Sequence, residues 1–181
     1  MTAGLAAGIA AVTVPVVLAV SLWGHARRPG VLVAAVRAHG TVPGPLVRPV
    51  AALAVAAEAV TGAGAAAGLL LGLDDLLCAC LALAAVLLGA YALYGTYVAR
   101  TRTHAVPCGC AGDASTPMTG WVAVRAGALA VLALAGAVWG PPASRPPAES
   151  LIVVAMGLVW AVLLWSLPPA MAQERERSPA G

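Results

Sequence analysis

The sequence predicts an all-α integral membrane protein, with a four-helix transmembrane bundle and a fifth, C-terminal transmembrane helix. Of its 181 residues, 61% are hydrophobic and 9% are charged, whereas a soluble domain carries about 25% charged residues. The apolar residues fall into five blocks, each close to the roughly 20 residues that a helix needs to cross a bilayer. Lipid offers no water to backbone amides, so segments of this length are expected to be helices.

The five predicted spans lie at about residues 3–22, 49–73, 76–99, 120–138 and 151–167. A signal peptide is the alternative for the first span, but no basic residue precedes its apolar run and no cleavage site is evident after it. The expected organisation is a membrane domain over residues 1–140, a proline-rich connector at 141–150, an additional helix at 151–168 and a polar tail at 169–181.

The arginines predict the orientation of the chain in the membrane. One side carries Asp74 and Asp75, together with a single arginine, Arg145, against Glu149. Eight arginines lie in connections on the other side: Arg27, Arg28, Arg37, Arg48, Arg100, Arg102, Arg175 and Arg177. The positive-inside rule then places the N-terminus outside and the C-terminus in the cytoplasm. We therefore expect a multi-pass protein of the cell membrane, whose net charge of +3 reflects orientation rather than nucleic-acid binding. The sequence contains no phosphate-binding loop or hydrolase nucleophile motif.

Two of the four cysteines flank a single glycine in the polar segment 101–117, TRTHAVPCGCAGDASTP. A disulfide requires Cα atoms about 4.4–6.8 Å apart, and two residue steps of about 3.8 Å reach that range only if the chain bends tightly. Gly109 permits such a bend between Cys108 and Cys110. A bridge in so small a ring is expected to be labile, as catalytic disulfides are.

Positive charge close to these cysteines would favour the thiolate, which is the form that attacks disulfides and binds metals. Arg100, Arg102 and Arg125 are the candidate sources of that charge, and His104 is a candidate base. Cys108 is closer to these groups in sequence, which favours it as the attacking thiol.

Cys78 and Cys80 have the same spacing but begin an expected helix, where residues two apart point to nearly opposite sides. We expect them to pack as small apolar residues. The alternative is an external relay pair at a frayed helix end.

Glu58 and Arg125 are the lone charges within their predicted spans. A carboxylate inside a bilayer normally faces a partner or a cavity. Counted from the cysteine side, Glu58 lies roughly 14 Å deep and Arg125 roughly 8 Å deep, a difference that an arginine side chain can cover. The sequence leaves two readings open: a structural ion pair or protonated carboxyl, and a proton-handling group near a redox or ligand site.

The order of these features resembles the MauE/DoxX redox-associated membrane proteins, named for methylamine utilisation. The shared order is a glutamate in the second span, an arginine pair ending the third, a CGC loop and an arginine early in the fourth. The segment RRPGVLVAAVRAHGTVP after the first span is also similar, so the resemblance covers about residues 5–138. The matching positions are Glu58, Gly62, Arg100, Arg102, Cys108, Cys110 and Arg125.

The family's typical pattern is CGCFG with an Arg-Asn in the fourth span, whereas this chain reads CGCAG and VRAG. Methylamine metabolism itself therefore does not follow from the resemblance. What the resemblance implies is maturation of exported proteins by thiol–disulfide exchange, with a thioredoxin-like protein as partner. A quinone as cofactor is suggested only by analogy with other helical-bundle thiol oxidases.

Disulfide delivery to exported proteins requires active thiols outside the cytoplasm, whereas the arginines place the CGC loop inside. A cytoplasmic pair could instead accept electrons from a thioredoxin pool, with Cys78 and Cys80 near the outer face. Two other classes remain open. A soft-metal binding or transport protein would use Cys108, Cys110 and His104 as ligands for Cu(I) or Zn; a structural membrane partner would use none of them.

Overall fold

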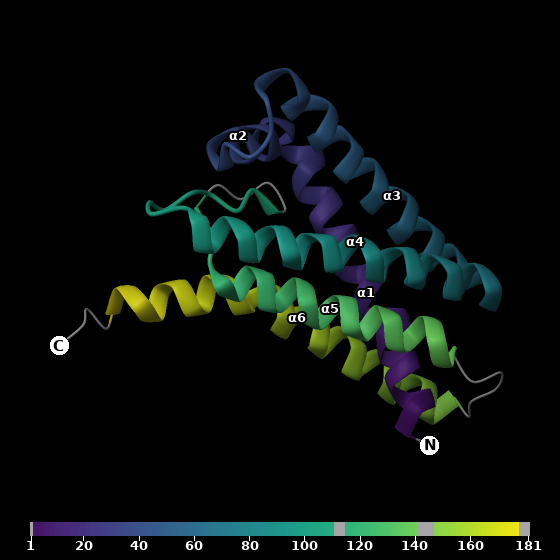
Figure 1. Cartoon of the computed structure of the whole chain (residues 1–181). Coiled ribbons are helices and arrows are strands. Elements are labelled where there is room, and N and C mark those ends of the chain that lie inside the picture. The colour runs from purple at the N-terminus through teal and green to yellow at the C-terminus, as the bar shows by residue number, and fades with distance from the viewer. Residues whose placement is uncertain (1, 111–114, 141–146, 178–181) are drawn as a thin grey trace.

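The computed structural model describes residues 2–110, 115–140 and 147–177. These residues form six α-helices and one short 3-10 helix (Figure 1). The α-helices are α1 (Thr2–Arg27), α2 (Pro29–His39), α3 (Val47–Leu71), α4 (Asp74–Thr101), α5 (Gly120–Trp139) and α6 (Pro147–Arg177), and the 3-10 helix η1 is Gly44–Leu46.

Five helices in the described part of the chain are long and apolar enough to cross a membrane. These candidate spans are Gly4–Arg27, Gly44–Leu71, Asp74–Thr101, Gly120–Trp139 and Ala148–Gln173. Large apolar side chains cover the outside of the molecule, with Leu70 82% exposed, Leu93 76% and Val86 73%. A surface of this kind fits a lipid bilayer, so the chain is a multi-pass helical membrane protein, and the predicted fold class is confirmed.

Four of the spanning helices form a closed bundle. Helix α1 packs against α3 and α5, and α4 packs against the same two helices from the other side. Helix α6 lies outside this bundle, against α1 and α5 (Figure 1). The arrangement is the predicted four-helix bundle with an additional C-terminal helix.

Small residues bring the helices close together. A Cβ atom added to Gly136 of α5 would lie 2.8 Å from the Ala10 Cβ of α1, and one added to Gly157 of α6 would lie 2.7 Å from the Val12 Cβ. The Thr13 hydroxyl also donates a 2.9 Å hydrogen bond to the Gly157 carbonyl. Helix association in lipid depends on such close van der Waals contact and on hydrogen bonds between helices.

The segment after the first span was expected to be a loop, but it contains a helix. Helix α2 begins at Pro29 and ends before Gly40, which has a left-handed conformation with φ of 61°. Proline at the first helical position and glycine just past the end are both characteristic helix boundaries. Helix α2 buries Ala35, Val36 and His39, and packs against α1 and α3.

The last helix is longer than the predicted span at residues 151–167. Helix α6 begins at Pro147 and continues through Pro168 and Pro169 to Arg177, so the tail expected from residue 169 is helical over most of its length. Membrane helices tolerate internal proline because other groups satisfy the carbonyls that it leaves free. Residues 141–146 of the predicted connector and residues 178–181 of the predicted tail lie outside the described residues.

Successive spanning helices run in opposite directions, so the connections between them lie at two different ends of the bundle. The turn between α3 and α4 lies at one end, where Asp74 and Asp75 begin α4. Helix α2 and the loop between α4 and α5 lie at the opposite end (Figure 1). Six of the eight arginines counted above belong to that second end: Arg27, Arg28, Arg37, Arg48, Arg100 and Arg102.

Candidate functional site

The loop between α4 and α5 is pinned at its base by a short antiparallel bridge between Pro107 and Pro117. The Cys108 amide donates to the Thr116 carbonyl at 2.9 Å, and the Met118 amide donates to the Val106 carbonyl at 2.8 Å. These bonds fix the backbone on both sides of the cysteines. Residues 111–114 of the loop lie outside the described residues.

A disulfide joins Cys108 and Cys110, whose Cα atoms are 5.4 Å apart. Gly109 between them has a φ of 73°, in the left-handed region that glycine adopts without a steric penalty. A Cβ atom at this position would lie 2.5 Å from the Ala35 Cβ of α2. Glycine is therefore required twice over, by the bend of the chain and by the close approach of α2.

His39 at the end of α2 holds the loop in place. Its Nε2 atom lies 2.8 Å from the Pro107 carbonyl oxygen. Because a carbonyl only accepts, Nε2 must carry the proton. In a neutral ring Nδ1 then accepts from the Tyr94 hydroxyl at 2.9 Å, and the Tyr94 oxygen accepts from Thr41 at 2.8 Å.

The surroundings of His39 favour this neutral form. Burial lowers the pKa of His39 below its ordinary value, and the positive charge of Arg102 acts in the same direction, while the bond to Pro107 opposes both. The chain from Thr41 through Tyr94 and His39 to Pro107 therefore fastens the cysteine loop to α2 and α4.

A cavity of about 280 Å³ lies inside the bundle next to the disulfide. Cys108 and Cys110 form part of its wall, and Trp165 of α6 contributes another part. Most of the lining is apolar, and includes Val17, Leu18, Ala54, Leu88, Val122, Ala126 and Leu129. The ionisable or hydroxyl side chains of the lining are Ser21, His25, His39, Glu58, Tyr91, Tyr94 and Arg125.

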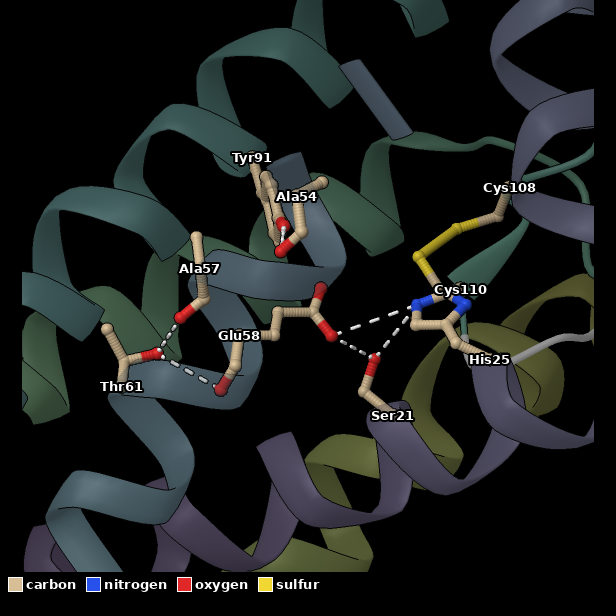
Figure 2. Close-up of polar contacts among 9 residues, drawn as sticks. All are labelled: Ser21, His25, Ala54, Ala57, Glu58, Thr61, Tyr91, Cys108 and Cys110. Carbon is tan, nitrogen blue, oxygen red and sulfur yellow. Dashed lines mark hydrogen bonds and ion pairs between the residues drawn. A yellow bond between two sulfur atoms is a disulfide. The ribbon is translucent and has the colours of Figure 1, made fainter. Parts of the chain in front are cut away.

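Glu58 of α3 is 5% exposed and points toward α1. The Ser21 hydroxyl donates to Glu58 Oε2 at 2.8 Å, and His25 Nε2 lies 3.8 Å from the same oxygen. Figure 2 shows these three side chains together with the Cys108–Cys110 disulfide, and all five residues line the same cavity. His25 is 5% exposed, and its other nitrogen, Nδ1, has no hydrogen-bond partner among the described residues.

The predicted direct pair between Glu58 and Arg125 is not formed. Within the described part of the chain, the basic side chain found within 4.0 Å of the Glu58 carboxylate is His25, at 3.8 Å between Nε2 and Oε2. The Arg125 guanidinium instead lies over the Trp165 ring, 5.5 Å from its centroid. Depth along a helix gives only the height of a side chain, and the rotation of α3 directs the carboxylate toward α1. Both charges nevertheless line the same cavity.

Of the other basic residues that the sequence singled out, only some lie near the cavity. His104 and Arg100 are exposed, and neither lines the cavity. Arg102 is partly buried and lies close to Gly40. Arg125 is thus the arginine that shares a cavity with the two sulfur atoms.

Sequence reasoning missed Ser21, His25, Tyr91 and Trp165. The first two carried a usable signal, because they lie four residues apart near the end of an apolar helix. Residues at this spacing share one helix face. A serine and a histidine on one face of a membrane helix indicate a polar partner on a neighbouring helix.

Cys78 and Cys80 are both free, as expected for residues two apart in a helix. Cys80 belongs to the apolar core, which confirms its predicted role in packing. Both residues lie in the first turns of α4, at the opposite end of that helix from the cysteine loop. The described residues contain no group of three or more His, Cys, Asp or Glu side chains that could hold a metal ion.

Comparison with known protein families identifies a match. The family model described as methylamine utilisation protein MauE matches residues 3–140. This range covers α1 to α5 and every residue of the cavity lining except Trp165. No curated protein and no solved structure matches the chain.

Proposed function

The chain belongs to the MauE family of methylamine utilisation proteins, and from this premise we propose that it is a membrane thiol–disulfide redox protein. In this proposal Cys108 and Cys110 alternate between a disulfide and a pair of thiols. Their partner is a thioredoxin-like protein. With the loop on the outer side of the cell membrane, the exchange would assist disulfide formation or maturation of exported proteins. With the loop on the cytoplasmic side, where the arginines place it, the pair would accept electrons from a cytoplasmic thioredoxin pool.

The observation that carries the proposal is the closed Cys108–Cys110 pair on a loop fastened to the bundle. The two members differ in access: Cys108 is 4% exposed, whereas Cys110 is partly exposed. Access therefore favours Cys110, and not Cys108 as its position in the sequence suggests, as the member that bonds to a partner.

The exchange follows ordinary thiol–disulfide chemistry. A thiolate of the partner attacks the Cys110 sulfur, the bond between Cys108 and Cys110 breaks, and Cys108 leaves as a thiolate. The second thiol of the partner then attacks the partner's first sulfur, which is bonded to Cys110, and releases Cys110. The partner ends as a disulfide, and the two electrons and two protons that it lost reside on the Cys108–Cys110 pair.

The test uses a thioredoxin probe with one remaining active-site cysteine, activated as a mixed disulfide with thionitrobenzoate. All proteins carry Cys78→Ser and Cys80→Ser, so that the loop pair supplies the only thiols. We expect Cys108→Ser to release thionitrobenzoate rapidly and to form an adduct that reducing agents cleave. Cys110→Ser should react far more slowly because Cys108 is buried.

The reduced wild-type pair is the matched control. Its adduct should be short-lived, because Cys108 resolves it. Failure of both single variants to form an adduct with the folded protein would refute the exchange. Protection of the thiols by added Zn²⁺ or Cu⁺, combined with failure of exchange, would move the soft-metal function ahead.

A further inference from the structure

On the premise of the redox function above, we propose that the cavity beside the Cys108–Cys110 disulfide binds a quinone, which accepts the electrons of the pair. The cavity lies among membrane-spanning helices, and most of its lining is apolar. A carrier dissolved in lipid is the kind of oxidant suited to such a place.

The size of the cavity suits the head group of such a carrier. Small-molecule sites have volumes of about 300–1,000 Å³, and the cavity, at about 280 Å³, lies just below that range. This volume fits a single substituted ring with its isoprenoid tail outside the cavity. Such sites combine an apolar lining with a few polar groups that fix the orientation of the ligand.

Two polar groups in this cavity lack partners that a quinone would supply. His25 Nδ1 is buried and has no hydrogen-bond partner among the described residues. The Arg125 guanidinium lies over Trp165, and no hydrogen bond from it is found within the described part of the chain. A buried nitrogen such as His25 Nδ1 is normally paired, and the partly buried Arg125 guanidinium has donors to spare. A quinone has two carbonyl oxygens that accept hydrogen bonds, and its reduced form has two hydroxyl groups that donate them.

The electron transfer balances without any other reactant. Two S–H bonds break, and one S–S bond forms between Cys108 and Cys110. The quinone gains the two electrons and two protons, and its two carbonyls become hydroxyl groups. His25 and Glu58 line the same cavity as the two sulfurs. The Ser21 hydroxyl lies 3.4 Å from His25 Nε2 and 2.8 Å from Glu58 Oε2, and this link suits the two groups to carry a proton.

The experiment uses the purified full-length chain with Cys78→Ser and Cys80→Ser, reduced and kept without oxygen. A short-chain ubiquinone and a short-chain menaquinone are added separately, and quinone absorbance and free thiols are followed together. We expect one quinone to be reduced for each pair of thiols lost. Glutathione disulfide serves as an oxidant that does not require the cavity.

Cavity-filling variants locate the reaction. Ala126 lines the cavity, whereas Ala128 on the same helix is exposed. We expect Ala126→Leu to slow quinone reduction about tenfold or more relative to its own reaction with glutathione disulfide, and Ala128→Leu to leave that ratio unchanged. Should Ala126→Leu fail to fold, Ala54→Leu of the lining and the exposed Ala56→Leu repeat the comparison from α3.

The outcomes separate this proposal from the one on which it rests. Oxidation by glutathione disulfide without oxidation by either quinone would overturn the quinone site and leave the thiol chemistry standing. Equal effects of the cavity and surface variants would place the quinone elsewhere, and would overturn the site as well. Failure of every oxidant would remove the redox function itself.

Discussion

Glu58 is a carboxylate inside a membrane bundle, and its neighbours explain how the fold accommodates it. The Ser21 hydroxyl donates a 2.8 Å hydrogen bond to Oε2, and His25 Nε2 lies 3.8 Å from the same oxygen. Ser21 and His25 belong to consecutive turns of α1, so a single helix face supplies both contacts. The carboxylate therefore couples α3 to α1 at the level of the disulfide.

A double-mutant cycle tests this coupling. Glu58→Gln and His25→Gln should each destabilise the protein, and the double variant should lose less than the sum of the two. Residues in contact couple by about 0.5–3 kcal/mol, and we expect at least about 1 kcal/mol here. The measurement is the free energy of unfolding in detergent, obtained by denaturant titration.

The matched control is the cycle of Glu58→Gln with Arg125→Gln. Its coupling energy should be smaller, because Arg125 shares the cavity but makes no direct ion pair with Glu58. A larger coupling with Arg125 than with His25 would restore the pairing that the sequence predicted.

His39 predicts a pH dependence of stability. Its pKa in the folded protein is lowered, mainly by burial and further by Arg102. Its contribution to stability is therefore fully present above the unfolded pKa of about 6.5, and is lost as pH falls through the folded pKa. The melting temperature should drop more between pH 8 and pH 5 in the wild type than in His39→Gln.

His104 supplies the control for that measurement, because it is exposed and lies on the same loop. His104→Gln should keep the pH dependence of the wild type. The same dependence in His39→Gln as in the wild type would show that protonation of His39 does not destabilise the protein.

The cysteine loop and α2 act together as one element. Gly109 lies against Ala35, and His39 reaches the Pro107 carbonyl from the end of the same helix. Helix α2, between the first two spans, thus supports the cysteine loop.

Gly109→Ala tests this packing of the cysteine loop against α2. Alanine at this position would have to adopt the left-handed backbone conformation of Gly109, which costs an L-residue about 1–2 kcal/mol. Its side chain would also displace Ala35. We expect a loss of at least that size in the free energy of unfolding, together with a smaller fraction of the closed disulfide by thiol alkylation.

Gly30→Ala is the comparison, because a Cβ atom at Gly30 of α2 would meet nothing within 4 Å. It should be neutral or slightly stabilising, since alanine is the better helix former. Equal effects of the two substitutions would mean that the close packing of the loop on α2 is unimportant.

For the whole molecule, the spans could be predicted because a bilayer imposes a length and an apolar composition on each helix. Glu58, Arg125 and the cysteines could be singled out because polar groups are rare in such helices. Helix α2 was missed although Pro29 and Gly40 mark both of its ends, because its short length falls below that of a span.

The partner of Glu58 could not be predicted by counting residues. Counting gives the depth of a side chain in the membrane, whereas contact also depends on how each helix is rotated about its axis. That rotation follows from packing at positions such as Gly136 and Gly157, which involve residues distant in the sequence. His104 is close to the cysteines in sequence, but it follows the end of α4 in the exposed part of the loop and lies outside the cavity.

The orientation of the molecule remains a prediction from its arginines, and two reporter cysteines test it. In a background with all four native cysteines replaced by serine, Leu73→Cys lies at the aspartate end and Ala38→Cys at the arginine end. Both positions are exposed. In intact cells a membrane-impermeant maleimide should label Leu73→Cys alone, and the reverse pattern would place the cysteine loop outside the cytoplasm.

The most direct test of the central claim is a redox titration of the Cys108–Cys110 pair in the folded protein. Protein with Cys78→Ser and Cys80→Ser is equilibrated in glutathione buffers of graded potential, and its thiols are counted by alkylation with a mass tag. We predict a reversible two-electron transition with a single midpoint, in which both thiols appear and disappear together. A pair that stays fully reduced in the most oxidising buffer, or that cannot be reduced until the protein is unfolded, would contradict the account.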